Sequence, residues 1–310
     1  MSGSSDPMQE PAMNSVRAPA VSPRLVLLGA VLGISFAAPL IRLSDAHPLA
    51  IAIWRLLFSM PIVAVMLMWN GGYRQWRGLQ VRDLGIALGA GFMLALHFWS
   101  WNTSVRLTSV AASAVLVNMQ PVIVALLSAM WLAEVPTRSQ RAGIAIAMLG
   151  ALFVALPDFW SSSAPAARNP LLGDGLALLG AVTAALYYLA GRRLRQQLDL
   201  WPYVALVYGA CLITLLLIAL VASVPLGGQS SREYAIFAGL AIGPMMLGHT
   251  GMNWALRYLP AYSVNVAVLG EPIGATILAA LLPGIHEIPS VWTVAGGVVI
   301  VLGVAMTLRK

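Results

Sequence analysis

The chain has 310 residues, of which 59% are hydrophobic and only 9% are charged, and its formal net charge is +7. Ordinary soluble domains carry about 25% charged residues, so this chain has too few charges to cover a soluble surface. Apolar runs of about 18–25 residues recur along it, each long enough to cross a hydrocarbon core of about 30 Å. The composition excludes a soluble domain and predicts an all-α polytopic membrane protein.

The elements follow in a simple order. Residues 1–22 are rich in Ser, Pro and Ala and lack apolar periodicity, so this cytoplasmic segment is predicted to be disordered. Two five-helix units are expected after it, over 23–157 and 170–308. Their short connections leave little room for a soluble catalytic domain. The ten predicted membrane-spanning helices are 24–43, 48–69, 82–104, 108–132, 138–156, 171–191, 201–224, 233–256, 260–283 and 289–308.

The basic residues predict the orientation of these spans, because cytoplasmic loops carry an excess of Lys and Arg. With the N-terminus in the cytoplasm, the inside segments hold Arg17, Arg24, Arg74, Arg77, Arg82, Arg138, Arg141, Arg192, Arg193, Arg195, Arg257, Arg309 and Lys310. The outside loops then hold only Arg42, Arg106, Arg168 and Arg232. We therefore expect a multi-pass protein of the cell inner membrane with both termini cytoplasmic.

The same distribution bears on partners and cofactors. Nucleic-acid binding needs basic residues gathered on one folded face, whereas here they are scattered at span ends, so the lipid bilayer and not nucleic acid is the expected partner. The lone Cys211 can form neither an intramolecular disulfide nor a metal cluster. We expect no cofactor and no metal, and a protein that acts as a monomer.

An internal repeat divides the chain. With a constant offset of 151 and no gap, "WNTSVRLTSVAASAVLVNMQP" (101–121) aligns with "MNWALRYLPAYSVNVAVLGEP" (252–272). The matched polar, charged and proline positions are Asn102 with Asn253, Arg106 with Arg257, Gln120 with Glu271, and Pro121 with Pro272.

Further along, a shift of two residues places Gly143 and Gly150 on Gly296 and Gly303. Five spans in each half are an odd number, so the second half is predicted to be inverted relative to the first. Inverted repeats around a central cavity are the usual basis of alternating access in secondary transporters.

These features resemble a known family. Ten spans in two five-helix halves, with paired blocks ending in "NMQP" and "GEP", are similar to the drug/metabolite transporter (DMT) superfamily, EamA type, over residues 24–308. The segment "LHFWSWNTSVRLTSVAASAVLVNMQP" resembles the YddG-type branch, whose members export aromatic and other neutral amino acids. The resemblance implies an amino-acid exporter.

Polar side chains inside spans usually face a cavity or a partner helix. His97 and Trp101 are four residues apart and share one helix face, and so do His249 and Asn253. These two faces are expected to line opposing walls of a central cavity. The alternative is that each histidine only bonds a neighbouring helix. Tyr187, in the sixth span, is expected with Trp101 to stack on an aromatic or apolar substrate.

The matched blocks supply further candidates. Asn118 is expected to contact substrate, whereas Gln120, two residues on, points about 200° away in a regular helix and should bond a neighbouring helix unless Pro121 distorts the turn. Glu271 is a carboxylate near the middle of a span, where an isolated charge is costly. It is interpreted either as a site for a proton or an ammonium group, or as a structural acid. Arg55 either neutralises a substrate carboxylate or, as preferred, snorkels outward or pairs with a polar group.

Two prolines, Pro121 and Pro272, lie near the centres of the fourth and ninth spans, where each frees the carbonyl four residues earlier. Their matched positions suggest a paired hinge, and the alternative is a static kink.

The function favoured is secondary export of amino acids, and the rival is multidrug or other metabolite efflux on the same scaffold. An enzyme is not expected, because the chain has no HExxH or GxSxG motif and no intramembrane aspartate pair. The chain also lacks a Walker-type glycine loop, so ATP is not the expected energy source.

Overall fold

The structure is a computed structural model that describes residues 19–108, 113, 116–160, 169–281 and 290–309. In these ranges every regular element is a helix. The α-helices and the two other helices, η1 (3-10) and η2 (π), are α1 Pro23–Ser35, α2 Ala37–Arg42, α3 Pro48–Trp69, η1 Gly72–Gly78, α4 Val81–Leu107, α6 Gln120–Trp131, α7 Arg138–Trp160, α8 Pro170–Leu194, α9 Leu200–Val221, α10 Ser231–Leu240, η2 Ala241–His249, α11 Thr250–Ala255, α12 Ala261–Val268, α13 Glu271–Leu281 and α14 Val291–Leu308.

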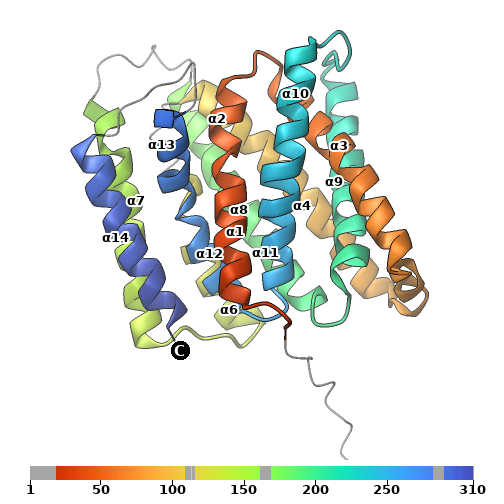
Figure 1. The fold of residues 1–310 in the computed structure, drawn as a ribbon, viewed down its shortest axis with the longest axis horizontal. Helices are drawn as coiled ribbons and strands as arrows, with labels where there is room; N and C mark the ends of the chain where they lie inside the picture. The colour runs from red at the N-terminus through yellow and green to blue at the C-terminus, as the bar shows by residue number, and fades with distance from the viewer. Residues whose placement is uncertain (1–18, 109–112, 114–115, 161–168, 282–289, 310) are drawn as a thin grey trace, which may run out of the picture.

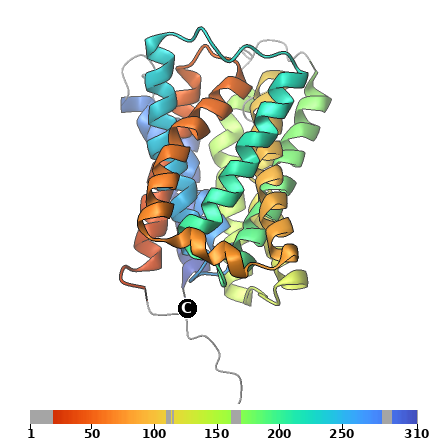
Figure 2. The same cartoon turned by 90° about the vertical axis from the view of Figure 1, so that its right-hand side faces the viewer.

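The long helices run side by side as one bundle (Figure 1; Figure 2). Eight segments are long and apolar enough to cross a membrane, which confirms the prediction of an all-helical protein with many spans. They are Pro23–Ile41, Pro48–Trp69, Val81–Ser104, Pro170–Leu194, Leu200–Val221, Ser231–Ala255, Ala261–Leu278 and Val291–Leu308.

The remaining two predicted spans correspond in part to α6 and α7. The apolar helix Gln120–Trp131 is too short to cross a membrane by itself. The exact number of ten spans stays a prediction. The segment predicted to be disordered, 1–22, lies outside the described residues apart from its last four.

Large apolar side chains on the outside of the bundle are exposed, including Leu25, Val65 and Leu217. Such a surface is stable in lipid and not in water. The core, by contrast, holds many alanines beside larger aliphatic and aromatic residues, and such small residues let helices approach closely. Both properties fit a bundle whose solvent is the bilayer.

The start of α1 and the end of α14 meet at one end of the bundle. In Figure 1 the start of α1 and the C-terminus lie together at the lower edge, and Arg24 Nη2 donates a hydrogen bond of 2.6 Å to the carbonyl of Leu308. We call this the terminal end of the bundle.

Helices α7 and α14 pack against each other in antiparallel directions through glycines (Figure 1). A Cβ atom built on Gly143 would lie 2.7 Å from the Gly303 carbonyl oxygen, and one on Gly150 would lie 2.8 Å from that of Gly296. The reciprocal distances are both 2.6 Å. The four glycines matched by the repeat therefore meet crosswise, as expected of two helices related by a local twofold axis.

We predict that Gly303→Ala loosens this contact, because its new Cβ atom would lie 2.4 Å from the backbone nitrogen of Ala147. Overpacking of this kind costs about 1–3 kcal/mol, which should lower the midpoint of thermal unfolding in detergent. The matched control is Gly85→Ala in α4, where no atom lies within 4 Å of the new Cβ. An equal melting temperature for the two variants would contradict the close contact.

Candidate functional site

The site is organised by two spans whose helices are interrupted. A turn at 118–119 precedes α6, and α12 is separated from α13 by two residues, 269–270. Pro121 and Pro272 are each the second residue of the helix that follows the interruption. Matched interruptions in the two halves of a transporter point to its binding site.

This arrangement differs from a static kink in a continuous helix, which is the alternative to the paired hinge. In the first turn of a helix, backbone N–H groups have no intrahelical acceptor, so proline sacrifices no hydrogen bond there. Pro121 and Pro272 therefore begin new helices rather than bending old ones. The interruptions also leave backbone polar groups near the centre of the bundle, where they must border a cavity or protein.

A third irregular segment borders the same region. Between α10 and α11 the chain forms the π-helix η2, which contains Pro244 and ends at His249. Its last turn packs on α1, where a Cβ atom on Gly33 would lie 2.8 Å from the Gly248 nitrogen. π-Helical segments are rare and frequently mark functional sites.

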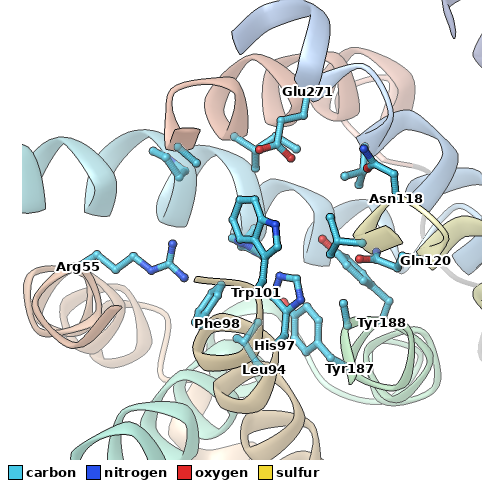
Figure 3. Close-up of a pocket in the computed structure, with 17 residues that line it drawn as sticks. Arg55, Leu94, His97, Phe98, Trp101, Asn118, Gln120, Tyr187, Tyr188 and Glu271 are labelled. Carbon is cyan, nitrogen blue, oxygen red and sulfur yellow. The ribbon is translucent and has the colours of Figure 1, made fainter. Parts of the chain in front are cut away.

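A cavity lies between these segments and helices α1, α2, α3, α4 and α8 (Figure 3). Most of its wall is apolar or aromatic, and its polar groups are few. The lining residues are Ile34, Ala37, Arg55, Leu94, His97, Phe98, Trp101, Val117, Asn118, Gln120, Ala184, Tyr187, Tyr188, Pro244, His249, Val268 and Glu271.

The cavity brings together six of the seven substrate-site candidates chosen from the sequence: His97, Trp101, Asn118, Tyr187, His249 and Glu271. Asn253 is the exception. It is fully buried behind Tyr187, to whose hydroxyl oxygen its Nδ2 donates a hydrogen bond of 2.5 Å. The residue thus positions a lining side chain and does not itself reach the cavity.

Asn118 and Gln120 both line the cavity, although a regular helix would direct them apart. The turn at 118–119 removes that constraint, so the distortion that Pro121 was considered to allow is present. Gln120 also donates from Nε2 to Oδ1 of the buried Asn265 on α12. It fulfils the predicted bond to a neighbouring helix and links the two interrupted spans.

His97 and Trp101 lie on one face of α4, as predicted. Their rings are nearly parallel, with centroids 6.2 Å apart and an interplanar angle of 11°. His97 Nδ1 lies 2.9 Å from the carbonyl oxygen of Gly180 on α8. Because a carbonyl only accepts, Nδ1 carries the proton. His97 therefore both bonds a neighbouring helix and lines the cavity.

The structure gives Arg55 a different place from the preferred expectation that it snorkels or pairs. Its side chain is only 3% exposed and extends from α3 into the cavity wall (Figure 3). The guanidinium carbon lies 3.5 Å from the centroid of the Phe98 ring. Nε and Nη2 are buried and have no hydrogen-bond partner within the described part of the chain.

Phe98, Tyr188 and Pro244 are further lining residues that were not chosen from the sequence. Phe98 sits between Arg55 and the ring of His249, whose centroid is 5.5 Å away. Arg55 itself had a visible signal, since no other Lys or Arg within a predicted span lies more than three residues from its end. The contact with Phe98 had none, because it depends on how α3 packs on α4.

Glu271 occupies the first position of α13 and faces the cavity from a different wall from Arg55 (Figure 3). The N-terminus of a helix is a favourable place for a carboxylate. Its backbone carbonyl accepts from Ser35 Oγ at 3.4 Å, whereas among the described residues its carboxylate has no hydrogen-bond partner. The carboxylate is therefore free to contact a ligand.

At the terminal end, polar contacts hold the two halves together. Glu134, between α6 and α7, accepts a hydrogen bond of 2.5 Å from Arg192 Nε and one of 3.1 Å from the Ala261 nitrogen. Arg192 Nη1 also donates to the Leu256 carbonyl at 2.7 Å. We call Glu134, Arg192, Leu256 and Ala261 the terminal latch; the side chains of its ion pair are only 17–19% exposed.

A second polar group at this end surrounds Asp199, just before α9. Its carboxylate accepts from Gln75 Nε2 and Arg257 Nη1, both at 2.6 Å. Burial opposes the charge, but these two hydrogen bonds outweigh it and lower the pKa of Asp199 below its usual value. The carboxylate is thus ionised at neutral pH and ties η1 to the turn after α11.

Comparison with known proteins is consistent with this architecture. The model of the EamA-like transporter family matches twice, over residues 24–156 and 171–309. An uncharacterized transporter of Archaeoglobus fulgidus is 26% identical over 281 residues, covering 90% of this chain and 95% of that protein. The uncharacterized transporter YdfC of Bacillus subtilis is 24% identical over 262 residues, covering 82% and 81%.

Among solved structures, one crystal structure superposes with a TM-score of 0.74 at 19% sequence identity. It covers 93% of this chain and 96% of its own. At this identity the likeness establishes the fold alone.

Proposed function

This chain belongs to the EamA-like transporter family, and from that premise we propose that it is a secondary transporter that exports aromatic and other neutral amino acids by alternating access. The relatives that it matches are likewise named as transporters. In this proposal the cavity of Figure 3 is the substrate site, and the two halves of the chain move around it.

The observation that carries the proposal is the composition of the cavity wall. It offers one carboxylate, on Glu271, and one guanidinium, on Arg55, beside two histidines and two side-chain amides, and the other groups are aromatic or apolar. A net-neutral solute with an ammonium group and an apolar side chain fits this wall. A cationic drug, the rival substrate, would be attracted by Glu271 but repelled by Arg55. Both effects are strong because the protein interior has a low dielectric constant.

Alternating access is supported by the arrangement of the halves. The family model matches once in each half, and α7 packs against α14 in an antiparallel, reciprocal contact. We propose ten spans in two inverted repeats, 23–157 and 170–308, after an N-terminal segment over 1–22. The terminal latch then represents the closed state of one gate.

The proposal includes a place for the protein in the cell. It is a monomer in the inner membrane, with both termini in the cytoplasm, the lipid bilayer as its surroundings and no nucleic-acid partner. On this orientation the terminal latch closes the cytoplasmic side.

We further propose that the two interruptions act as a paired hinge. Pro121→Ala and Pro272→Ala are each expected to slow transport several-fold without weakening substrate binding, because alanine lets the preceding residues join a longer, stiffer helix. The control is Pro61→Ala, at a proline inside the continuous helix α3 and away from the cavity. Full-rate transport by both hinge variants would rule out the hinge.

The function itself is tested by counterflow into proteoliposomes. A panel of labelled aromatic and other neutral amino acids is compared with a cationic drug, with and without a pH gradient. We expect counterflow of amino acids. The proposal would be overturned if the drug showed counterflow and no amino acid did. A transport rate that does not change with the pH gradient would identify facilitated diffusion.

A further inference from the structure

We propose that Arg55 is the specificity-determining residue of the cavity and that it binds the carboxylate of the substrate through the edge formed by Nε and Nη2. This inference rests on the proposed function, since it concerns the same cavity. It narrows the substrate class to solutes with a free carboxylate beside an ammonium group.

The first observation is that the two unpartnered nitrogens of Arg55, Nε and Nη2, form the edge of the guanidinium that binds a carboxylate side-on. In a guanidinium group, Nε–H and the neighbouring N–H of Nη2 point in the same direction and bind both oxygens of a carboxylate side-on. In Arg55 these two atoms are buried and lack a partner within the described residues. Buried polar groups are almost always hydrogen-bonded, and a charged one left alone is especially costly, so this pair indicates a missing ligand.

The second observation is that the position of the guanidinium is fixed before any ligand arrives. Its carbon lies 3.5 Å from the centroid of the Phe98 ring, and a cation at this distance is attracted by the face of the ring. Stacking on a ring leaves the N–H edge of the planar group free. Phe98 thus holds Arg55 in place without using the hydrogen bonds that a carboxylate needs.

Nearby donors extend the same subsite. Trp101 Nε1 and His249 Nδ1 are also buried without a partner in the described part of the chain, and both residues line the cavity. The indole N–H can only donate. Arg55 Nε, Arg55 Nη2 and Trp101 Nε1 are therefore unpartnered donors that match the oxygens of an anionic group.

Glu271 completes the recognition from another wall. With the carboxylate at Arg55 and the ammonium group toward Glu271, both charges of a zwitterion are neutralised. The side chain is then left among Trp101, Tyr187 and Tyr188. Two opposite charges held apart in this way discriminate against both a simple amine and a simple carboxylic acid.

The test compares phenylalanine with phenethylamine, which has the same ring and amine but no carboxylate. Binding of both to purified wild type, Arg55→Gln and Arg55→Lys is measured in detergent. We expect Arg55→Gln to lose phenylalanine affinity about tenfold to a hundredfold, as is typical for a charge-assisted hydrogen bond, and to bind phenethylamine as well as or better than wild type. Arg55→Lys should be intermediate, because lysine keeps the charge but not the fork.

The control is Arg232→Gln, at an arginine whose side chain is 60% exposed and does not line the cavity. If Arg55→Gln still prefers phenylalanine over phenethylamine as strongly as wild type does, the assignment of Arg55 is overturned. Should wild type bind no amino acid of the panel at all, the proposed function fails instead. A shared loss of both ligands with a lower melting temperature would show that Arg55 is structural, which also contradicts the assignment.

Discussion

Glu271→Gln should reduce amino-acid counterflow about tenfold or more. An ammonium group that contacts a carboxylate in a water-poor cavity forms a hydrogen bond of about 1.5–3 kcal/mol, and about 1.4 kcal/mol corresponds to a factor of ten. Glutamine has nearly the same shape and keeps an acceptor, but it lacks the charge. Its repeat mate, Gln120, shows that the fold accommodates glutamine at the equivalent position.

The effect of Glu271→Gln should be confined to ligands that carry an ammonium group. Phenylpropionate, which keeps the carboxylate but has no ammonium group, is expected to bind Glu271→Gln at least as well as it binds wild type. The control is Asp45→Asn, the same chemical change at a side chain that is 92% exposed. Wild-type transport by Glu271→Gln at every pH would make Glu271 a structural acid, the alternative raised by its position in an apolar run.

Glu134→Ala is predicted to open the terminal end. The carboxylate holds both Arg192 and the Ala261 backbone, so its removal frees the start of α12 and leaves Arg192 with carbonyl acceptors only. Loss of a partly buried charged hydrogen bond of about 1.5–3 kcal/mol should raise the population open at this end about tenfold or more.

The measurement is the rate at which a cysteine in the cavity wall is labelled. Because the chain has a single native cysteine, one substitution removes every competing thiol. In a Cys211→Ala background, Ala184→Cys places one thiol in the cavity wall. A membrane-impermeant maleimide is applied to the side of the membrane that carries the termini. A tag on one terminus identifies that side. Arg232→Ala, which breaks an exposed ion pair, should leave the labelling rate unchanged. Equal rates in Glu134→Ala and wild type would show that the latch does not gate the cavity.

Hydropathy and residue spacing were sufficient for most of the helices and for part of the site. The four-residue spacing of His97 and Trp101 fixes a shared face in any helix, and the structure has that face on the cavity. The matched prolines lie at the two interruptions, although the sequence placed them within continuous spans. Local patterns succeed here because helix geometry alone decides the outcome.

Other features depend on packing, which no local pattern records. Asn118 and Gln120 share a wall only because the helix stops between them. Asn253 is four residues from His249 and was expected on the same helix face. It lies behind Tyr187, because α8 occupies the space between Asn253 and the cavity. The role of Arg55 depends on the ring of Phe98 in another helix, so the sequence alone suggested the ordinary behaviour of an arginine near a span end.

The central claim is that one cavity recognises the two charges of an amino acid from two different walls. An experimental structure with phenylalanine bound tests it most directly. The account predicts the carboxylate oxygens within hydrogen-bond distance of Nε and Nη2 of Arg55 and the ammonium group facing Glu271. A ligand seated outside this cavity, or one whose carboxylate contacts neither nitrogen of Arg55, would contradict it.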